Sequence, residues 1–336
     1  MKKLLTGVAA AMLSASTIAL AEIPKVVNVG IISTESSQVL EKNWKPFLAD
    51  MAAYLNTEVK PFFASDYAGI IEGMRFGKVH LAWYGNKAAM VAVDRSGGEV
   101  FAQTIKKDGT EGYYSLLIAH KDSPINSLDD LLKCDKSLTF GNGDPNSTSG
   151  FLVPSFYVWA KNNQTPDNCF KRVLTSNHSG NALAVANKKV DIATNNTENL
   201  YDRLANTHPD KFQQIKEIWR SPLIPSDPMV WKKDLDQDFK EKLAYFFLQY
   251  GRFGDLDKVA RERANLGIMS DGWGPFLASS NAQLIPIRQL ALFKDKLKIE
   301  KDDKMSDADK KAKIAEIDAA LAEVARFKEA VGDGGN

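Results

Sequence analysis

The segment Gly141–Gly150, with the sequence GNGDPNSTSG, has the residue types of an anion-binding loop. It lies between a predicted strand and a predicted helix, and its glycines permit tight turns. Ser147, Thr148 and Ser149 place three hydroxyl groups in the first turn of that helix. The amides of a first turn lack partners within the helix and lie at the positive end of the helix dipole. A tetrahedral oxyanion is therefore the expected ligand, although the same three residues could serve only to cap the helix.

Basic side chains are absent from this part of the sequence, since no Lys or Arg occurs between Lys136 and Lys161. We therefore expect neutral dipoles to hold the anion without help from a basic side chain. Such a site suits reversible capture, because release of the anion then breaks no strong ion pair.

Catalytic and metal-binding patterns are not found in the sequence. The four histidines are scattered without H-E-x-x-H spacing, and neither a G-x-S-x-G motif nor a Walker loop is present. Ser147 also lacks the paired base that a nucleophilic serine needs. We therefore expect a binding protein that uses no cofactor and no metal, with an exported hydrolase of such an oxyanion as the lower alternative.

The composition and charge of the chain exclude several classes of protein. Its 336 residues include 43 Lys and Arg against 42 Asp and Glu, with 44% hydrophobic residues and only two cysteines. A nucleic-acid binder usually carries a basic excess, which this chain lacks, so no nucleic acid is expected as a partner. The composition is that of a globular protein with an ample core, and the length suggests two domains or one large domain.

Residues 1–21, MKKLLTGVAAAMLSASTIALA, have the pattern of a secretory signal peptide. A charged start precedes a short apolar stretch, and Ala19-Leu20-Ala21 fits the small-x-small rule for cleavage before Glu22. The apolar stretch is shorter than the roughly 20 residues that a membrane span needs. We therefore expect export to the periplasm as a soluble chain.

Export also makes Cys134 and Cys169 candidates for one disulfide, because exported proteins fold in an oxidising compartment. Neither cysteine lies in a C-x-x-C or metal-ligand pattern. The spacing alone does not decide between a disulfide and two separate thiols.

Strand and helix patterns alternate along the chain, which predicts α/β units with parallel strands and helices on both faces. Val26–Ser33 is a β-rich run, and Gln38–Leu55 repeats apolar residues at helical spacing. We divide the chain into a first lobe at 22–120, a second lobe at 121–220 and a return segment at 221–298 that completes the first. This order resembles the two-lobed periplasmic binding proteins of type II, which close on a small ligand about a hinge between the lobes.

Residues 299–336 differ from the rest and form a predicted helical tail. Ser306 and Asp309 have the spacing of a helix-capping pair. Apolar residues then recur at three- and four-residue steps, at Ile314, Ile317, Leu321, Val324 and Phe327. A stretch of about three heptads is short for a coiled coil. Two interpretations stay open: a helix packed on its own body, and a homodimer formed through this helix.

Seven strings spread over the chain make a pattern far more specific than one short motif. They are VGIISTES (29–36), DYAGIIEGMRFGKV (66–79), AWYGN (82–86), FGNGDPNSTSGFLVP (140–154), NALAVANKKVDIATNNTENL (181–200), SPLIPSDP (221–228) and IPIRQLALFK (285–294). In this order they resemble the substrate-binding protein of the phosphonate ABC transporter, in the family that binds phosphate, phosphite and phosphonate. The resemblance covers nearly the whole chain after residue 21.

The resemblance implies a set of residues that hold the phosphonate group. Ser147, Thr148 and Ser149 correspond to the residues at the helix start that bind its oxygens, and His178 is placed to donate to them. From the sequence alone, His178 could equally be a cap at the start of an Ala-rich helix.

The resemblance also implies the contacts to the rest of the ligand. Tyr67 and Tyr113 correspond to aromatic residues of the first lobe, whose rings pack on the carbon chain while their hydroxyls donate. Glu198 and Asp227 correspond to the acids that receive an ammonium group. Without the resemblance, the tyrosines would be ordinary aromatics, Glu198 a first-turn acid and Asp227 a turn residue.

Donors at one end of a site and two carboxylates at the other select an aminoalkyl phosphonate, and 2-aminoethylphosphonate is the expected ligand. Inorganic phosphate would leave the carboxylates without a counter-charge, so we expect methylphosphonate and phosphite to bind more weakly and phosphate most weakly. The implied partner is an inner-membrane ABC permease, to which the captured ligand is delivered. The alternative is the same fold binding phosphite, phosphate or another oxyanion.

Overall fold

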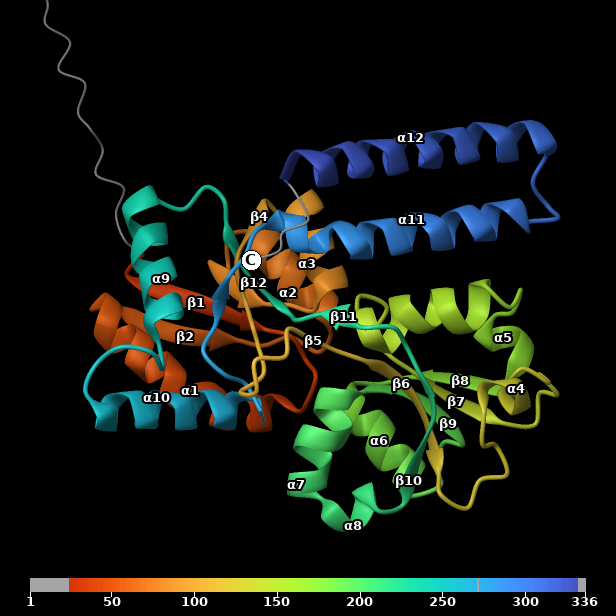
Figure 1. Ribbon diagram of the computed structural model, residues 1–336, viewed down its shortest axis with the longest axis horizontal. Helices are drawn as coiled ribbons and strands as arrows, with labels where there is room; N and C mark the ends of the chain where they lie inside the picture. Colours follow the sequence, from red (N-terminus) through yellow and green to blue (C-terminus); the bar gives the residue numbers. More distant parts are fainter. Residues whose placement is uncertain (1–23, 271, 332–336) are drawn as a thin grey trace, which may run out of the picture.

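The computed structural model describes residues 24–270 and 272–331, so the expected signal peptide lies outside the described residues. The chain forms two lobes, each built on its own β-sheet, and ends in a helical hairpin (Figure 1). The first lobe lies on the left of Figure 1 and the second on the lower right. None of the described helices is long and apolar enough to cross a membrane.

Lobe 1 is built on a six-stranded sheet of mixed direction. Its strands are β1 (Val26–Ile31), β2 (Glu58–Phe62), β3 (Leu81–Trp83), β4 (Gly98–Gln103), β12 (Pro228–Lys232) and β13 (Leu277–Ala278), in the order β13-β4-β12-β3-β1-β2. β1 is parallel to β2 and β3, whereas β12 is antiparallel to β3 and β4. The expectation of parallel strands throughout is therefore wrong, because β12 enters the sheet from lobe 2 rather than through a β-α-β crossover.

Five helices pack around this sheet. They are α1 (Ser37–Leu55), α2 (Tyr67–Arg75), α3 (Asn86–Arg95), α9 (Gln237–Gln249) and α10 (Leu256–Met269). The apolar face expected for the first helix is buried, except that Val39 is exposed. Trp44 and Phe47 of α1 are fully buried, and the Phe47 ring contacts Phe247 of α9 and Phe276. Aromatic packing of this kind gives the lobe a rigid core.

Lobe 2 is built on a five-stranded sheet that is buried on both faces. Its strands are β6 (Ser115–His120), β7 (Thr139–Asn142), β8 (Arg172–Thr175), β9 (Ile192–Asn196) and β10 (Ile215–Arg220), in the order β10-β6-β9-β7-β8. Leu117 and Ala119 of β6 belong to one hydrophobic cluster, and Leu116 and Ile118 belong to another. Because side chains alternate along a strand, the two clusters lie on opposite faces of the sheet.

The helix expected from Ser147 to Lys161 is present, but most of it is π-helical. The π-helical segments η1 (Thr148–Leu152) and η2 (Ser155–Ala160) follow one another on either side of Pro154, and η3 (Glu198–Leu204) is a third. Wide turns of this type are frequent at functional sites. The other helices of lobe 2 are α4 (Leu128–Leu131), α5 (Pro166–Cys169), α6 (His178–Ala186), α7 (Ala205–Thr207) and α8 (Pro209–Phe212).

The chain crosses between the lobes at a short two-stranded ladder. β5 (Gly112–Tyr113) and β11 (Ile224–Pro225) pair antiparallel, so the outgoing and returning segments lie side by side. The sequence suggested that lobe 1 gives way to lobe 2 at residue 120. Because β6 belongs to the sheet of lobe 2, this boundary falls earlier in the chain, at the ladder. Two adjacent crossings leave the lobes free to rotate about them, which is the geometry of a hinge.

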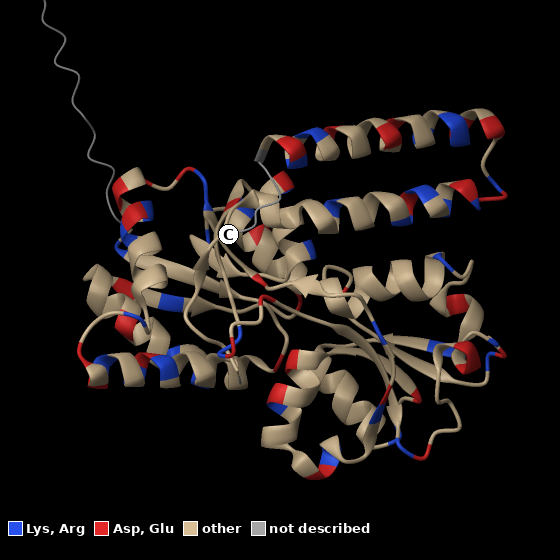
Figure 2. Cartoon of the chain, viewed as in Figure 1, with Lys and Arg blue, Asp and Glu red and all other residues tan. Residues whose placement is uncertain are grey.

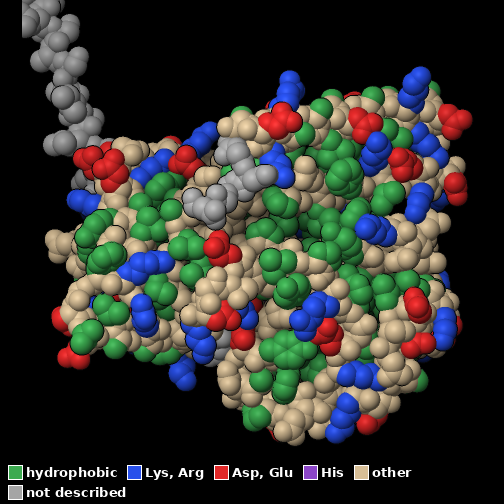
Figure 3. All heavy atoms as spheres, in the orientation of Figure 1, with side chains coloured by type: hydrophobic (Ala, Val, Ile, Leu, Met, Phe, Trp, Pro, Cys, Tyr) green, Lys and Arg blue, Asp and Glu red, His purple; other side chains and the backbone are tan. Residues whose placement is uncertain are grey.

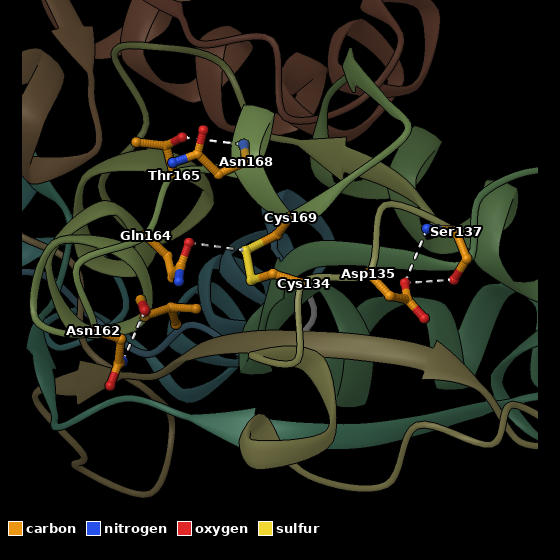
Figure 4. The surroundings of a disulfide bond; sticks show 9 residues. Cys134, Asp135, Ser137, Asn162, Gln164, Thr165, Asn168 and Cys169 are labelled. Carbon is orange, nitrogen blue, oxygen red and sulfur yellow. Dashed lines mark hydrogen bonds between the residues drawn. A yellow bond between two sulfur atoms is a disulfide. The ribbon is translucent and has the colours of Figure 1, made fainter.

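Cys134 and Cys169 form a disulfide in lobe 2, which confirms the pairing considered from the sequence (Figure 4). The bond joins the loop after α4 to the end of α5. Hydrogen bonds fix the backbone next to each cysteine. After Cys134, the Asp135 carboxylate accepts from the Ser137 amide at 2.9 Å, and Thr165 caps α5, which ends at Cys169. The disulfide therefore connects a loop to a short helix at the edge of lobe 2, and neither cysteine lines the cavity between the lobes.

The C-terminal tail folds as a helical hairpin (Figure 1). α11 (Ile285–Glu300) and α12 (Asp307–Val331) run antiparallel, and Lys296 of α11 pairs with Asp318 of α12 at 2.6 Å. α11 also contacts α3 of lobe 1 and η2 of lobe 2. The helix expected in the tail is therefore present and packs on the chain's own α11.

Candidate ligand-binding site

A narrow cavity between the lobes collects the residues that the family resemblance implies. All eight of them line it: Tyr67, Tyr113, Ser147, Thr148, Ser149, His178, Glu198 and Asp227. Seven are buried, and Glu198 is half-buried. A wider hollow nearby, lined by Tyr201, Arg263 and Trp273, contains none of the eight. The candidate site is therefore the narrow cavity.

Several helices of both lobes begin at this cavity. The residues that begin α2, η1, α6 and η3 all line it, as does the N-cap residue of α3; they are Tyr67, Thr148, His178, Glu198 and Gly85. The first amides of a helix have no partner within the helix, and the helix start carries partial positive charge. Converging helix starts favour a ligand with concentrated negative charge, such as a tetrahedral oxyanion.

The glycines of the anion loop are required by close packing rather than by turn geometry. The Gly143 amide donates to the Gly150 carbonyl at 3.1 Å. A Cβ atom on Gly143 would lie 2.6 Å from the Gly150 backbone, and one on Gly150 would lie 2.9 Å from the Ser147 hydroxyl oxygen. Neither glycine has a positive φ. The loop therefore brings its backbone close to the helix start in a way that larger residues would prevent.

The three hydroxyl oxygens of the helix start each accept a hydrogen bond from within the protein. Ser147 Oγ accepts from the Gly150 amide at 3.0 Å, and Ser149 Oγ accepts from Asn196 Nδ2 at 3.2 Å. Thr148 Oγ1 accepts from the Lys87 amide of lobe 1 at 2.8 Å. Because these contacts use acceptor positions, each hydroxyl hydrogen stays available to donate to an anion. The capping role considered from the sequence holds for Ser147 and is compatible with anion binding.

The two tyrosines from lobe 1 are buried in the wall of the cavity. The Tyr67 amide donates to Asp144 Oδ2 of lobe 2 at 3.0 Å, which fixes the start of α2 against the anion loop. The Tyr113 hydroxyl donates to Asp227 Oδ1 at 3.0 Å. Burial raises the pKa of both tyrosines, so both hydroxyls are protonated and can act as donors.

Two acids, Glu198 and Asp227, line the cavity and interact with each other. Burial raises the pKa of Asp227 well above its usual range, and the negative charge of Glu198 raises it further. Burial also raises the pKa of Glu198, while the positive charges of Lys106 and Arg203 act in the opposite direction. A cation near both carboxyls would relieve this repulsion and favour their ionised forms.

His178 is the first residue of α6 and is 5% exposed. Asn177, and not His178, provides the cap of this helix, because its side chain accepts from the Gly180 amide. Burial, with the nearby Arg203 charge, lowers the pKa of His178 to about 4. Its Nδ1 atom has no hydrogen-bond partner among the described residues. At neutral pH the uncharged imidazole therefore has one N–H donor and one acceptor nitrogen, and its Nδ1 is free to bond a ligand.

Arg203 corrects one expectation from the sequence. Its guanidinium lines the same cavity and is 7% exposed, so the site does contain a basic side chain. The sequence reasoning considered only residues near the anion loop, whereas Arg203 reaches the cavity from η3. Its charge is paired with Glu35 at 3.3 Å.

Other lining residues were also missed. Asn196 and Asn199 flank Glu198, and Thr34, Trp83 and Ser270 come from lobe 1. The Asn196 side chain bridges Ser149 and the Asn199 amide, so it connects the anion loop with η3. The polar run around Glu198 was the only sequence signal for these two residues. No group of three or more His, Cys, Asp and Glu residues in the described part of the chain could hold a metal ion.

The fold and the cavity define a two-lobed periplasmic-type solute-binding protein of type II. The family described as the periplasmic substrate-binding protein of phosphonate ABC transporters matches residues 29–282. The chain is 55% identical over 307 residues to the "Phosphonates-binding periplasmic protein" of Escherichia coli K12, covering 91% of this chain and 88% of that protein. The chain therefore belongs to the family of periplasmic substrate-binding proteins of phosphonate ABC transporters.

Solved structures show the same relationship. A binding-protein component of an ABC phosphonate transporter from Pseudomonas aeruginosa superposes with a TM-score of 0.86 at 54% identity, covering 91% of this chain and 99% of that one. PhnD1 of Prochlorococcus marinus, solved with methylphosphonate, shares the fold, with a TM-score of 0.68 at 22% identity over 80% of this chain and 97% of its own. Members of the family are substrate-binding proteins and not enzymes, so this chain is a binding component of an ABC importer.

Proposed function

We propose that this protein captures phosphonates that carry an ammonium group, with 2-aminoethylphosphonate as the preferred ligand, and delivers them to an ABC permease. The observation that carries the proposal is one cavity between the lobes with hydroxyl donors at the start of η1 and two neighbouring acids, Glu198 and Asp227. The hydroxyl groups and helix starts would bind the phosphonate oxygens. The acids would bind the ammonium group.

The negative charge of the two acids favours the binding of 2-aminoethylphosphonate over the binding of simpler oxyanions. An ammonium group lowers the free energy of two buried carboxylates that otherwise repel each other. Methylphosphonate and phosphite have no such group, so they leave the acids uncompensated. Inorganic phosphate would in addition place a fourth oxygen toward the acids, which is repulsive.

The second candidate is the same site binding phosphate or phosphite. A "Phosphate-import protein PhnD" of Mycolicibacterium smegmatis is 29% identical over 72% of this chain, and a probable phosphite binding protein of Prochlorococcus marinus is 25% identical over 65%. These names show that relatives on this fold are associated with simpler oxyanions. The buried pair of acids favours the aminophosphonate for this chain.

Calorimetric titration of the purified protein with each ligand tests the proposal. We expect the affinity to decrease in the order 2-aminoethylphosphonate, methylphosphonate and phosphite, and phosphate, with about a hundredfold between the first and the last. Equal affinities for phosphate and the aminophosphonate would contradict the proposed specificity. Binding of none of the four would contradict the proposed function as a whole.

The location follows from the same proposal. Delivery to an inner-membrane permease requires a periplasmic protein, and the signal pattern at residues 1–21 supports export with cleavage before Glu22. Mass spectrometry of the protein recovered from a periplasmic extract would give a mature chain beginning at Glu22. An uncleaved chain in the cytoplasmic fraction would contradict this assignment.

We also propose that the α11–α12 hairpin provides a homodimer contact. None of the described side chains of α12 is buried, and Phe293 and Phe327 are each 45% exposed. Figure 3 shows hydrophobic side chains along the side of the molecule where this hairpin lies. Removal of residues 302–336 should convert a dimer into a monomer in light-scattering measurements, while a monomeric full-length chain would exclude the contact.

A further inference from the structure

Two adjacent residues of η3, Asp202 and Arg203, carry opposite charges and both reach across the cleft to lobe 1. Asp202 pairs with Lys106, and Arg203 pairs with Glu35. Figure 2 shows the described charges of both signs interspersed over the two lobes, without segregation into one basic and one acidic lobe. The attraction between the lobes at η3 is therefore local to these two pairs. We refer to the four residues together as the clasp.

The inner half of the clasp is almost completely buried. The side chains of Arg203 and Glu35 are 9% and 11% exposed. Glu35 Oε1 accepts from Arg203 Nη1 at 3.3 Å and also from the Ser179 hydroxyl of α6. Arg203 Nη2 donates to the hydroxyl of Ser270, which follows α10 in lobe 1, at 3.3 Å. One guanidinium thus holds two separate segments of lobe 1.

The outer half of the clasp lies closer to solvent. Lys106 Nζ is 2.6 Å from Asp202 Oδ2, and the side chains are 21% and 27% exposed. Lys106 follows β4 in lobe 1, far from Glu35 in the sequence. The two pairs therefore fasten η3 to two different parts of the other lobe.

These contacts depend on closure of the lobes. When the lobes rotate apart, all four ions become hydrated, so their attraction contributes only to the closed form. The apparent affinity of a ligand that binds the closed form scales with the population of that form. η3 also begins at Glu198, so the same helix bears a ligand contact at its start and the clasp one turn later.

We propose that the clasp sets how long the closed protein retains its ligand, independently of which phosphonate is bound. The inference rests on the proposed function, because it assumes that the interlobe cavity is the ligand site. It assigns Glu35 and Lys106 as positioning residues, which stabilise the closed form and do not line the cavity. Substitution of Glu35 should therefore change retention without changing specificity, whereas Lys106 also acts on the charge of Glu198.

Stopped-flow dissociation of 2-aminoethylphosphonate and methylphosphonate tests this separation. We expect Glu35→Gln to raise the dissociation rate of both ligands by about tenfold, with the ratio of the two affinities unchanged. Lys106→Gln should raise the dissociation rate of methylphosphonate by about threefold; this ligand is used because Lys106 also acts on the charge of Glu198. Arg261→Gln is the matched control, because Arg261 pairs with Asp50 entirely within lobe 1. The control should dissociate at the wild-type rate.

A double variant in which the charges of one pair are exchanged distinguishes loss of the ion pair from a folding defect. The double variant Lys106→Asp with Asp202→Lys restores the attraction between the lobes and should return the dissociation rate of methylphosphonate to within about twofold of wild type. Small-angle X-ray scattering of the ligand-saturated proteins should show a larger radius of gyration for Glu35→Gln than for wild type. The exchanged pair should match the wild-type value.

Three results would overturn the proposal. One is a wild-type protein that binds phosphonates while Glu35→Gln and Lys106→Gln release them at the wild-type rate. Another is a change in the ratio of the two affinities in Glu35→Gln, which would show that Glu35 acts on the ligand and not only on closure. The third is an exchanged pair that releases ligand as fast as Lys106→Gln. Absence of binding to the wild-type protein would instead contradict the proposed function.

Discussion

The hydroxyl group of Tyr113 donates a hydrogen bond to Asp227 Oδ1 at 3.0 Å, across the short ladder that joins the lobes. This donor opposes the effect of burial and of Glu198, both of which raise the pKa of Asp227. The hinge region therefore helps to determine the charge of an acid in the ligand cavity. The first prediction concerns this bond.

Replacement Tyr113→Phe removes the donor and should raise the pKa of Asp227 further. An ammonium group needs the ionised carboxylate, so affinity for 2-aminoethylphosphonate should decrease as the pH falls through this pKa. In the variant the decrease should begin at a higher pH, with affinity at pH 7 lowered by about three- to tenfold. Titrations between pH 5 and pH 8 measure the shift. Methylphosphonate serves as the control because its phosphonate group also titrates with pH but it has no ammonium group. If the ratio of the two affinities depends on pH in the same way in wild type and in Tyr113→Phe, the prediction is wrong.

The double replacement Glu198→Gln with Asp227→Asn should change specificity rather than abolish binding. Affinity for 2-aminoethylphosphonate should fall by about a hundredfold, because the ammonium group loses both counter-charges. Affinity for methylphosphonate should change by less than about threefold, since it has no cation to place there. Calorimetry gives both values, with Glu217→Gln on the surface of lobe 2 as the control. Equal losses for the two ligands would show that the acids do not select the ammonium group.

The single replacement Asp227→Asn should stabilise the ligand-free protein at neutral pH. The folded-state pKa of Asp227 lies well above the usual value of 3.8, so the free energy of unfolding falls as the pH rises from the usual value toward the folded-state value. Asparagine removes this effect and still accepts from Tyr113. We expect a melting temperature about 2 °C or more above wild type at pH 7, with the gain shrinking toward pH 4. A variant that melts below wild type at pH 7 would contradict this prediction.

Loss of hydroxyl groups at the start of η1 should weaken every ligand. Thr148→Val and Ser149→Ala each remove one donor to the anion, and a hydrogen bond to a charged group is worth about 1.5–3 kcal/mol. We expect a loss of roughly tenfold or more for each variant with both phosphonates. Ser155→Ala, further along the same helical segment, is the control and should bind as wild type does. If a variant that lacks the hydroxyls of Ser147, Thr148 and Ser149 together binds with wild-type affinity, this loop is not the oxyanion site.

Removal of the disulfide should affect stability and leave binding unchanged. The bond closes a loop with a sequence separation of 35 residues at the edge of lobe 2. The double variant Cys134→Ser with Cys169→Ser should lose about 2–4 kcal/mol of unfolding free energy in urea titrations. Its affinity for 2-aminoethylphosphonate should match wild type at 25 °C, because neither cysteine lines the cavity. A large change in affinity at equal folded fraction would contradict this separation.

Much of the site could be predicted because its residues lie in local motifs. The loop at Gly141–Gly150 combines glycines, a cap and hydroxyls within one turn, and the family resemblance brought in distant residues such as Tyr67 and Asp227. Arg203 could not be predicted, since its partner Glu35 is 168 positions away and only the tertiary fold brings them together. The reason for the glycines was also missed, because contacts between backbone segments leave no pattern in a single sequence.

The fold shows a similar limit. The alternation of strands and helices predicted the α/β class, but the direction of β12 depends on the route of the chain between the lobes. Several elements were not anticipated, among them α10 and β10, which are the longest of these. α10 has few apolar residues on its buried face, and Leu256 at its start is 87% exposed, so helical periodicity is weak there. β10 lies at the edge of its sheet and carries charged side chains, which conceal a strand.

The helix starts around the cavity belong to different lobes. Each lobe therefore provides only part of the electrostatic attraction that an incoming anion experiences. α2 and α3 move with lobe 1, whereas η1, α6 and η3 move with lobe 2. An open cleft therefore presents two partial electrostatic fields on separate walls, and the complete field exists only once the walls meet. A dianion that first touches either wall gains further stabilisation from shutting the cleft, so the charge of the cargo itself helps to drive the motion that encloses it.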